Sequence, residues 1–559
     1  MFNSRMFCKK NLHTLYNLCI FAAELKLIRQ SSSGTNGSIF THTLISILYI
    51  SFYLNKKPYL CPIKKSYMNK IQKYSIGAAL ALFYYLAYSG NLSHIIAYHE
   101  QHHLFLYTEA YFEQQMQSEG FFSYLTDFII QFFYYPALGS ALLALLLASV
   151  YFMTRNIIHL MFGKEDLLHL SILPSLALFY HTMEASHTLV PVTTTVSTLA
   201  IINLIVWIFR NHMPLIPIFK NFHIKKKGIR TGITTVALFI FSGYGYYHFV
   251  KSYNRSEGIM LKAEMHVKKK DWDKVLDYTQ LYMSGGKTNH LISYFHHLAL
   301  FHKGELINRL FDNPPLLGVK SLYFPWNSDS RESEYGHIIY EHLGHINEAH
   351  HWEFEAMSVW GETAPHLLNL ARYNIVNHRP KVAQRFINKL KQSLFYHEEA
   401  LQLEKVLESG QVEGLRNAVS GVVDTPARFT NAKNIGPELE YICNHDPKNK
   451  MAFEYLMSYL LLSNNVTRFV DNLHRIQEFS YPSMPSAYEE ALLIYRLKIG
   501  EEEFAKTGFT ISQETENRFA RYFQLTESKQ MKTLQQEFGR SYWFYQNYIS
   551  PYGNKAIDN

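Results

Sequence analysis

Residues 136–154 read PALGSALLALLLASVYFMT, a run of 19 residues without a charged side chain. A helix needs about 20 apolar residues to cross roughly 30 Å of hydrocarbon, so this stretch predicts a transmembrane helix. Proline suits the first turn of a helix, which places the start at Pro136. The preceding residues 121–135 are rich in Phe and Tyr but include Asp127 and Gln131. Because aromatic side chains favour the headgroup layer, we expect an interfacial helix there.

Four other segments have a similar apolar character: residues 71–92, 167–183, 189–209 and 231–250. The segment 167–183 is the shortest, and it carries His169, Pro174 and His181. Together with residues 136–154, these segments predict about five membrane spans.

The charges between these segments predict their orientation. Residues 210–230 hold six Lys and Arg and no acid, Arg155 and Lys164 follow the second span, and Lys70 and Lys73 flank the first. Residues 93–120 instead hold four Glu and no Lys or Arg. By the positive-inside rule the basic segments are cytoplasmic. Five spans then leave residues 251–559 outside, which in a bacterium is the periplasm.

The composition divides the chain into three parts. Of its 54 Lys and Arg and 46 Asp and Glu, nine basic residues and one acid lie in residues 1–67, together with Cys8, Cys19 and Cys61. The other residues are neutral overall, so we expect no nucleic-acid partner. We interpret residues 1–67 as a basic N-terminal extension, residues 68–250 as the transmembrane domain and residues 251–559 as an extracytoplasmic domain. An alternative interpretation is that residues 1–67 lie upstream of a true start at Met68.

The C-terminal part has helical spacing throughout. Leu291, Phe295 and Leu298 mark one apolar helix face, and residues 452–460 repeat the pattern. Helices that follow short polar turns are expected near five positions: Asp271, Gly304, His345, Lys381 and Val466. The intervals between these five positions are typical of helix-pair repeats. We therefore predict an all-α protein with a tetratricopeptide-like solenoid. Such a solenoid binds partner proteins on its concave surface or, alternatively, only packs on the membrane domain.

The sequence HEQHH at residues 99–103 matches the zinc-binding pattern H-E-x-x-H. His99 and His103 would bind the metal, Glu100 would activate water, and a third ligand would come from Glu109, Glu113 or Glu119. Because the chain has 28 His, a chance match is the better explanation. The nine His between residues 290 and 351 are better explained by helix packing than by metal binding.

A second enzyme hypothesis uses the same loop. Some polyprenyl-sugar glycosyltransferases carry a catalytic acid after their first span, and Glu100, Glu109, Glu113 and Asp127 occupy a comparable place. Those enzymes usually have more spans. The chain has no phosphate loop, nucleophile elbow or dinucleotide fingerprint. We therefore assign no catalytic residue, no metal ligand and no cofactor.

Several motifs in this loop suggest a family: Glu100-Gln101 with Leu104-Phe105, Thr108 with Tyr111-Phe112, and residues 131–136 with Gly139. They resemble an uncharacterised integral-membrane family of Bacteroidota, a domain of unknown function. The resemblance runs from about Met68 to the C-terminus and implies a polytopic membrane protein with a helical outer domain. The family pattern centres on Glu100-Gln101, and Glu119-Gly120 stands where the family has paired glycines.

The sequence favours an inner-membrane scaffold or interaction protein whose periplasmic solenoid engages other envelope proteins, with the lipid bilayer as its second partner. The alternative is a membrane enzyme that uses the first outer loop, for lipid-linked glycosyl transfer or zinc hydrolysis. We also expect Asp127 and Gln131, four residues apart, to line a polar pocket together with Glu100 and Gln101, because an unpaired charge in hydrocarbon costs at least about 2.5 kcal/mol.

Overall fold

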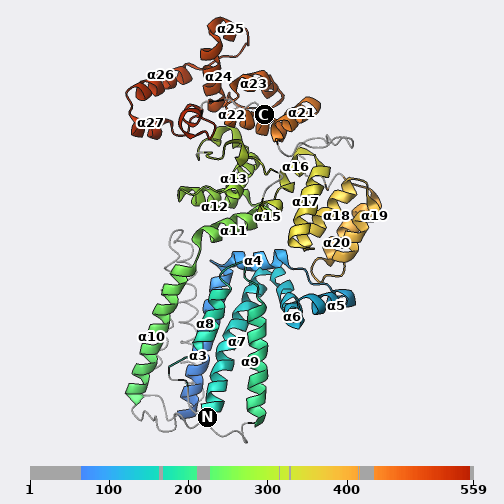
Figure 1. Cartoon of the computed structure of the whole chain (residues 1–559), viewed down its shortest axis with the longest axis vertical. Coiled ribbons are helices and arrows are strands. Elements are labelled where there is room, and N and C mark those ends of the chain that lie inside the picture. Colours follow the sequence, from blue (N-terminus) through green and yellow to red (C-terminus); the bar gives the residue numbers. More distant parts are fainter. Residues whose placement is uncertain are drawn as a thin grey trace, which may run out of the picture. The chain divides into compact units, whose positions relative to one another are not determined.

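The computed structural model describes residues 65–162, 166, 168–209, 227–313, 315–325, 329–412, 415, 434–553 and 555 (Figure 1). It is all-helical, with 76% helix and no strand among these residues. The predicted extension falls almost wholly outside them. Two compact units divide the chain. Unit 1 comprises Met1–Asn91, Leu143–His181 and Thr194–Tyr253, and unit 2 comprises Leu92–Leu142, Thr182–Thr193 and Asn254–Asn559.

Unit 1 is built from the apolar helices. These are α3 (Lys65–Ser89), most of α7 (Pro136–Phe162), α8 (Ile172–His181), most of α9 (Val190–Phe209) and α10 (Lys227–Ser252). Polar side chains connect these helices. The Tyr84 hydroxyl lies 2.8 Å from that of Ser175, and Tyr180 donates to the Gly245 carbonyl at 2.6 Å.

Two helices are long and apolar enough to cross a membrane by length and composition: Pro136–Met161 and Val190–Phe209. They correspond to the second and fourth predicted spans, and α7 begins at Pro136 as expected. Among the described residues of the predicted third span, the helix α8 covers only Ile172–His181, and residues 170 and 171 before it form a turn. The α3 and α10 helices have sufficient length but lower hydropathy, so the five-span arrangement stays a prediction.

The first part of unit 2 is the Leu92–Leu142 segment. It contains α4 (Ser93–His102), α5 (Glu109–Ser118), α6 (Phe121–Ile130) and the 3-10 helix η1 (Gln131–Tyr134) before α7 begins. Thr108 caps α5 by accepting from the Tyr111 amide. The predicted interfacial helix is therefore two short helices, and Gly120 at φ 86° makes the turn that precedes α6.

The rest of unit 2 consists of helices that pack mostly against their neighbours in sequence. The longer ones are α11 (Arg255–Lys268), α12 (Trp272–Ser284), α13 (His290–His302), α17 (Ile346–Trp360), α18 (Ala364–Val376), α19 (Pro380–Leu390), α20 (His397–Ser409), α21 (Ile435–His445), α22 (Lys450–Leu462), α24 (Ser486–Ile499) and α26 (Gln513–Glu527). Short helices between or after them are α14 (Leu306–Arg309), η3 (Gly318–Ser321), α15 (Ser330–Ser333), α16 (His337–Leu343), α23 (Val466–Leu473), η5 (His474–Glu478), α25 (Glu501–Ala505), α27 (Met531–Phe538), α28 (Tyr542–Phe544) and η6 (Tyr545–Ile549).

The five predicted helix starts are confirmed to within two residues, at α12, α14, α17, α19 and α23, although α14 is only one turn long. The preceding turns share one geometry. In each, one residue has positive φ and the next amide donates to the carbonyl five residues earlier, which is the Schellman helix ending. The positive-φ residues are Lys270, Gly304, Gly344, His378, Asn464 and, before α27, Lys529.

Most of the apolar core of unit 2 is one cluster that runs from Met260 to Tyr545. A second cluster lies among α18, α19 and α20, and Leu104 of the Leu92–Leu142 segment packs against it. A third, around Trp543, joins the last helices. The loop that follows the first predicted span therefore shares a core with the C-terminal helices.

Candidate functional site

The candidate site is the contact of the Leu92–Leu142 segment with the C-terminal helices of unit 2. Helix α4 packs against α11, α18 and η1. Ile95, Ile96 and His99 on α4 are buried. This packing carries the polar residues of the HEQHH sequence into the unit, where their partners identify their roles.

The structure does not bring the HEQHH residues and the candidate third ligands together. Helix α4 ends at His102, and His103 has an extended backbone with its Nδ1 2.8 Å from the His99 carbonyl oxygen. Burial lowers the pKa of His99 well below its ordinary value. Glu109 and Glu113 are exposed on α5, and Glu119 accepts from Ser123. Within the described ranges no three His, Cys, Asp or Glu residues form a group that could hold a metal.

Glu100 accepts a hydrogen bond from the hydroxyl of Tyr396, 296 residues away in the sequence. Burial raises the pKa of Glu100, and the Tyr396 hydrogen bond opposes part of that change. The Tyr396 ring lies edge-on to Tyr134, whose hydroxyl donates to Glu399 at 3.2 Å. Glu100 therefore links α4 to the start of α20. The sequence contains no local signal for Tyr396, because its partner is chosen by packing.

His102, the last residue of α4, pairs with the buried carboxylate of Glu334. Its Nε2 lies 3.4 Å from Glu334, which also accepts from Lys268 at 2.5 Å. Burial by itself would raise the pKa of Glu334, but Lys268 and His102 together hold it well below the ordinary value. Glu334 therefore joins α4 to α11.

Two further groups of ion pairs and hydrogen bonds involve residues near Glu334 in the sequence. The first group is centred on Arg331. Arg331 donates to Glu264 and Glu257, each at 2.8 Å, and Tyr335 donates to Glu264 at 3.1 Å. The second group is centred on two buried carboxylates, Glu341 and Glu353.

In that second group, Arg372 and Tyr373 donate to Glu341 at 2.8 and 2.6 Å. His366 Nδ1 lies 2.5 Å from Glu353. Although burial opposes it, hydrogen bonding by His337 and the charge of Arg372 lower the pKa of Glu341. None of these partners was predicted, because ion pairs between helices leave no periodic pattern in the sequence.

Asp127 and Gln131 each have a tyrosine partner from the stretch before or within α5. Tyr111 donates to Asp127 at 3.0 Å, and Tyr107 donates to Gln131 at 3.1 Å. Burial raises the pKa of Asp127. Phe105 lies among these rings, 5.4 Å from Tyr111 and 5.5 Å from Phe128. Because Asp127 and Glu100 bond to different partners, the pocket that they were expected to share stays a prediction.

An aromatic contact joins the end of the segment to the turn between α19 and α20. The ring of Phe395 stacks on Tyr134 at 5.2 Å and lies 5.8 Å from Phe132 and 5.6 Å from Tyr135. The Tyr107 amide donates to the Gln392 carbonyl at 2.9 Å. Of the residues that carry the family resemblance, Glu100, Leu104 and Tyr134 attach this segment to the C-terminal helices, whereas Tyr111 bonds within the segment.

Three histidines of the C-terminal helices illustrate the contacts that these side chains make. His302 stacks on Trp272 with ring centroids 4.0 Å apart. His297 Nδ1 lies 3.1 Å from the Ser321 carbonyl, and His290 pairs with Glu332 at 3.0 Å. Cys443 is buried and free.

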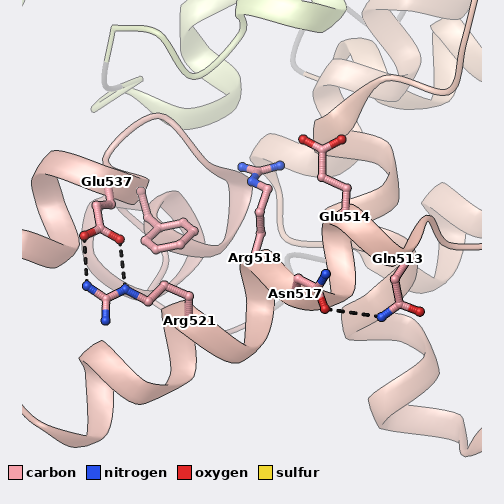
Figure 2. A pocket seen from close by; sticks show the side chains of 7 residues that line it. Gln513, Glu514, Asn517, Arg518, Arg521 and Glu537 are labelled. Carbon is pink, nitrogen blue, oxygen red and sulfur yellow. Dashed lines mark hydrogen bonds and ion pairs between the residues drawn. The ribbon is translucent and has the colours of Figure 1, made fainter.

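A separate surface pocket of about 690 Å³ lies between α26 and α27 (Figure 2). Its two arginines are already paired. Arg521 makes two contacts of 3.1 Å with Glu537, and Arg518 donates to Glu490 at 2.8 Å. Gln513 bonds to Asn517. The Arg521–Glu537 pair joins α26 to α27, and the Arg518–Glu490 pair joins α26 to α24. None of the candidate acids of the first outer loop lines the pocket.

Comparison with known proteins identifies a family but no characterised relative. No curated protein and no solved structure matches the chain. One family model matches residues 66–251 and 200–549, and its description is "Family of unknown function (DUF6057)". Since these two matches together span most of the sequence, the chain belongs to this family of unknown function.

Proposed function

We propose that this protein is a multi-pass inner-membrane protein that acts as a scaffold, with a periplasmic helical-repeat domain that engages other envelope proteins. One observation carries the proposal. The positive-inside rule assigns three parts of the chain to the outside: the loop after the first span, the short loop around Glu184 and everything after residue 251. These parts correspond closely to the three segments that form unit 2.

This correspondence supports the topology because the charge of a loop and the packing of the backbone are independent properties. The basic residues lie in the loops between the apolar segments, whereas the two units differ in which segments pack together. A compact unit formed from segments on opposite sides of a bilayer would have to pass through it. The basic residues 210–226 lie outside the described residues.

The surface of the candidate spans supports a lipid environment. Only 17% of the apolar window in α9 is buried, and Ile201, Leu204 and Trp207 are more than half exposed. Val236 and Phe239 on α10 are similarly exposed. The central helix of a soluble domain would bury such side chains, because complete burial of a large apolar side chain stabilises a fold by about 1.5–3 kcal/mol relative to full exposure.

Two features support a scaffold over an enzyme. The repeated Schellman turns between helices are consistent with a helix-pair solenoid, an architecture whose extended surface binds other proteins. The acids proposed for catalysis are divided between structural hydrogen bonds, at Glu100 and Asp127, and the exposed face of α5, at Glu109 and Glu113. No described contact favours the glycosyl-transfer or zinc-hydrolysis alternative.

The topology is tested with reporter fusions to the full chain. A reporter that is active only in the periplasm should be active after Asn559 and inactive when inserted in the basic loop after Lys226. A reporter that is active only in the cytoplasm should show the opposite pattern. Cytoplasmic activity after Asn559 would overturn the periplasmic assignment.

A further inference from the structure

The turn between α19 and α20 presents an apolar side chain to solvent. Residues 391–396 read KQSLFY, and residues 392–396 have no charged side chain. Leu394 is 52% exposed, whereas its neighbour Phe395 is held between Phe132, Tyr134 and Tyr135. A single exposed leucine is common on protein surfaces. The location of Leu394 relative to the candidate span makes it informative.

Phe395 contacts the residues that lead directly into that span. Tyr135 immediately precedes Pro136, the first residue of the candidate span Pro136–Met161. Tyr135 and Leu138 are 55% and 41% exposed, and both belong to unit 2, as does Leu394. Residues 128–142 contain no charged side chain. The turn is therefore held beside the point where the chain would enter hydrocarbon.

Three other exposed aromatic side chains lie in the Leu92–Leu142 segment. Tyr107, bonded through its amide to Gln392, is 52% exposed, and Phe112 and Phe121 are 41% and 52% exposed. Exposed tyrosine and phenylalanine side chains suit the headgroup layer, where one end of a tyrosine meets water and the ring meets acyl chains.

We propose that the α19–α20 turn, with Leu394 at its tip, inserts into the interfacial layer of the phospholipid bilayer, so that the C-terminal domain has a membrane contact of its own. The inference rests on the proposed membrane location. It adds that a part of the chain more than 200 residues after the loop touches lipid directly. The occupant of this surface is the bilayer, because the surface is continuous with the start of the span.

The test measures the depth of a nitroxide spin label in the full chain. Cys8, Cys19 and Cys61 are replaced by serine and Cys443 by alanine, and single cysteines are introduced by Leu394→Cys, Leu145→Cys and Leu497→Cys. Leu145 lies on α7 and is 60% exposed, and Leu497 lies on α24 and is 64% exposed, so both match Leu394 in type and exposure. Each protein is labelled in nanodiscs of phosphatidylethanolamine and phosphatidylglycerol. Relaxation by oxygen, which concentrates in lipid, is compared with relaxation by a water-soluble nickel chelate.

We expect the label at 145 to be relaxed mainly by oxygen, the label at 497 mainly by nickel, and the label at 394 to favour oxygen several-fold more than the label at 497. A label at 394 that matches 497, while 145 stays in lipid, overturns this inference alone. A label at 145 that is relaxed as strongly by nickel as 497 overturns the membrane location and with it the inference.

Discussion

Two parts of the Leu92–Leu142 segment contact the C-terminal helices through different kinds of interaction. Helix α4 uses buried polar groups, with Glu100 bonded to Tyr396 and His102 to Glu334. The stretch that ends at Tyr135 uses rings, which surround Phe395. Loss of one partner of a buried ion pair leaves an uncompensated charge, whereas loss of a ring removes only the contacts of that ring.

The difference implies that the two contacts respond differently to solution conditions. The polar contact depends on the ionisation of Glu334 and therefore on pH, whereas the rings that surround Phe395 contact it without a carboxylate. The segment is thus attached by one contact centred on a buried carboxylate and by one that consists mainly of rings. Mutations in the polar contact and mutations in the aromatic contact can therefore distinguish the two.

The largest effect is expected for Glu334→Ala. This change leaves Lys268 and His102 without their shared carboxylate in a buried site, which costs about 3–5 kcal/mol of unfolding free energy. Thermal unfolding of the purified full chain, followed by circular dichroism, measures the loss. Glu113→Ala removes the same charge from the exposed face of α5 and should change stability by less than about 0.5 kcal/mol. Equal effects of the two changes would show that Glu334 is not paired as described.

The pH dependence sharpens the same comparison. Because the folded pKa of Glu334 lies below the ordinary value of 4.5, the ionised group stabilises the fold above that pH, and this stability is lost as pH falls below it. In Glu334→Gln the loss of stability below pH 4.5 should be smaller than in the wild type, although Glu341 contributes in the same direction. An unchanged acid profile would contradict the assignment.

A smaller effect is expected for Phe395→Ala. Three ring contacts disappear, each worth about 0.5–1.5 kcal/mol, so the loss should be about 3 kcal/mol and the same at pH 4 and pH 7. Unfolding of the full chain at both pH values is the measurement. Phe523→Ala, at a site that is 53% exposed, is the control and should have little effect. A loss that grows at low pH would link the two contacts and end the distinction.

The smallest effect is expected for Gly139→Ala, on the first turn of α7. A Cβ atom there would lie 2.8 Å from the Phe133 ring and 2.9 Å from the Phe133 backbone, so the residues before the span must shift at a cost of about 1–2 kcal/mol. The control is Gly243→Ala on α10, where nothing lies within 4 Å of the added atom. That change should be neutral or slightly stabilising, because alanine favours helix more than glycine does. Equal destabilisation by both would mean that Phe133 does not restrict Gly139.

Much of the helical framework could be predicted from the sequence, because its signals are local. The starts of α12 and α23 follow Asp271 and Asn465, whose side chains cap the next helix. Pro136 predicted the start of α7 by its fixed backbone angle. Prediction was less successful between residues 167 and 183, where hydropathy suggested a span but the helix covers only Ile172–His181. Average apolar character does not reveal where a helix begins.

The sequence by itself determined that the chain is helical, where most helices start, that residues 136–161 and 190–209 are apolar enough to cross a membrane, and that the charge of its loops alternates. Only the tertiary structure decided what the residues of the HEQHH motif do. Glu100 and His102 find Tyr396 and Glu334, more than 200 residues away. Local propensity and periodicity act over a few residues, whereas the choice of a partner for a buried charge depends on which helices come together and on the cost of leaving that charge unpaired.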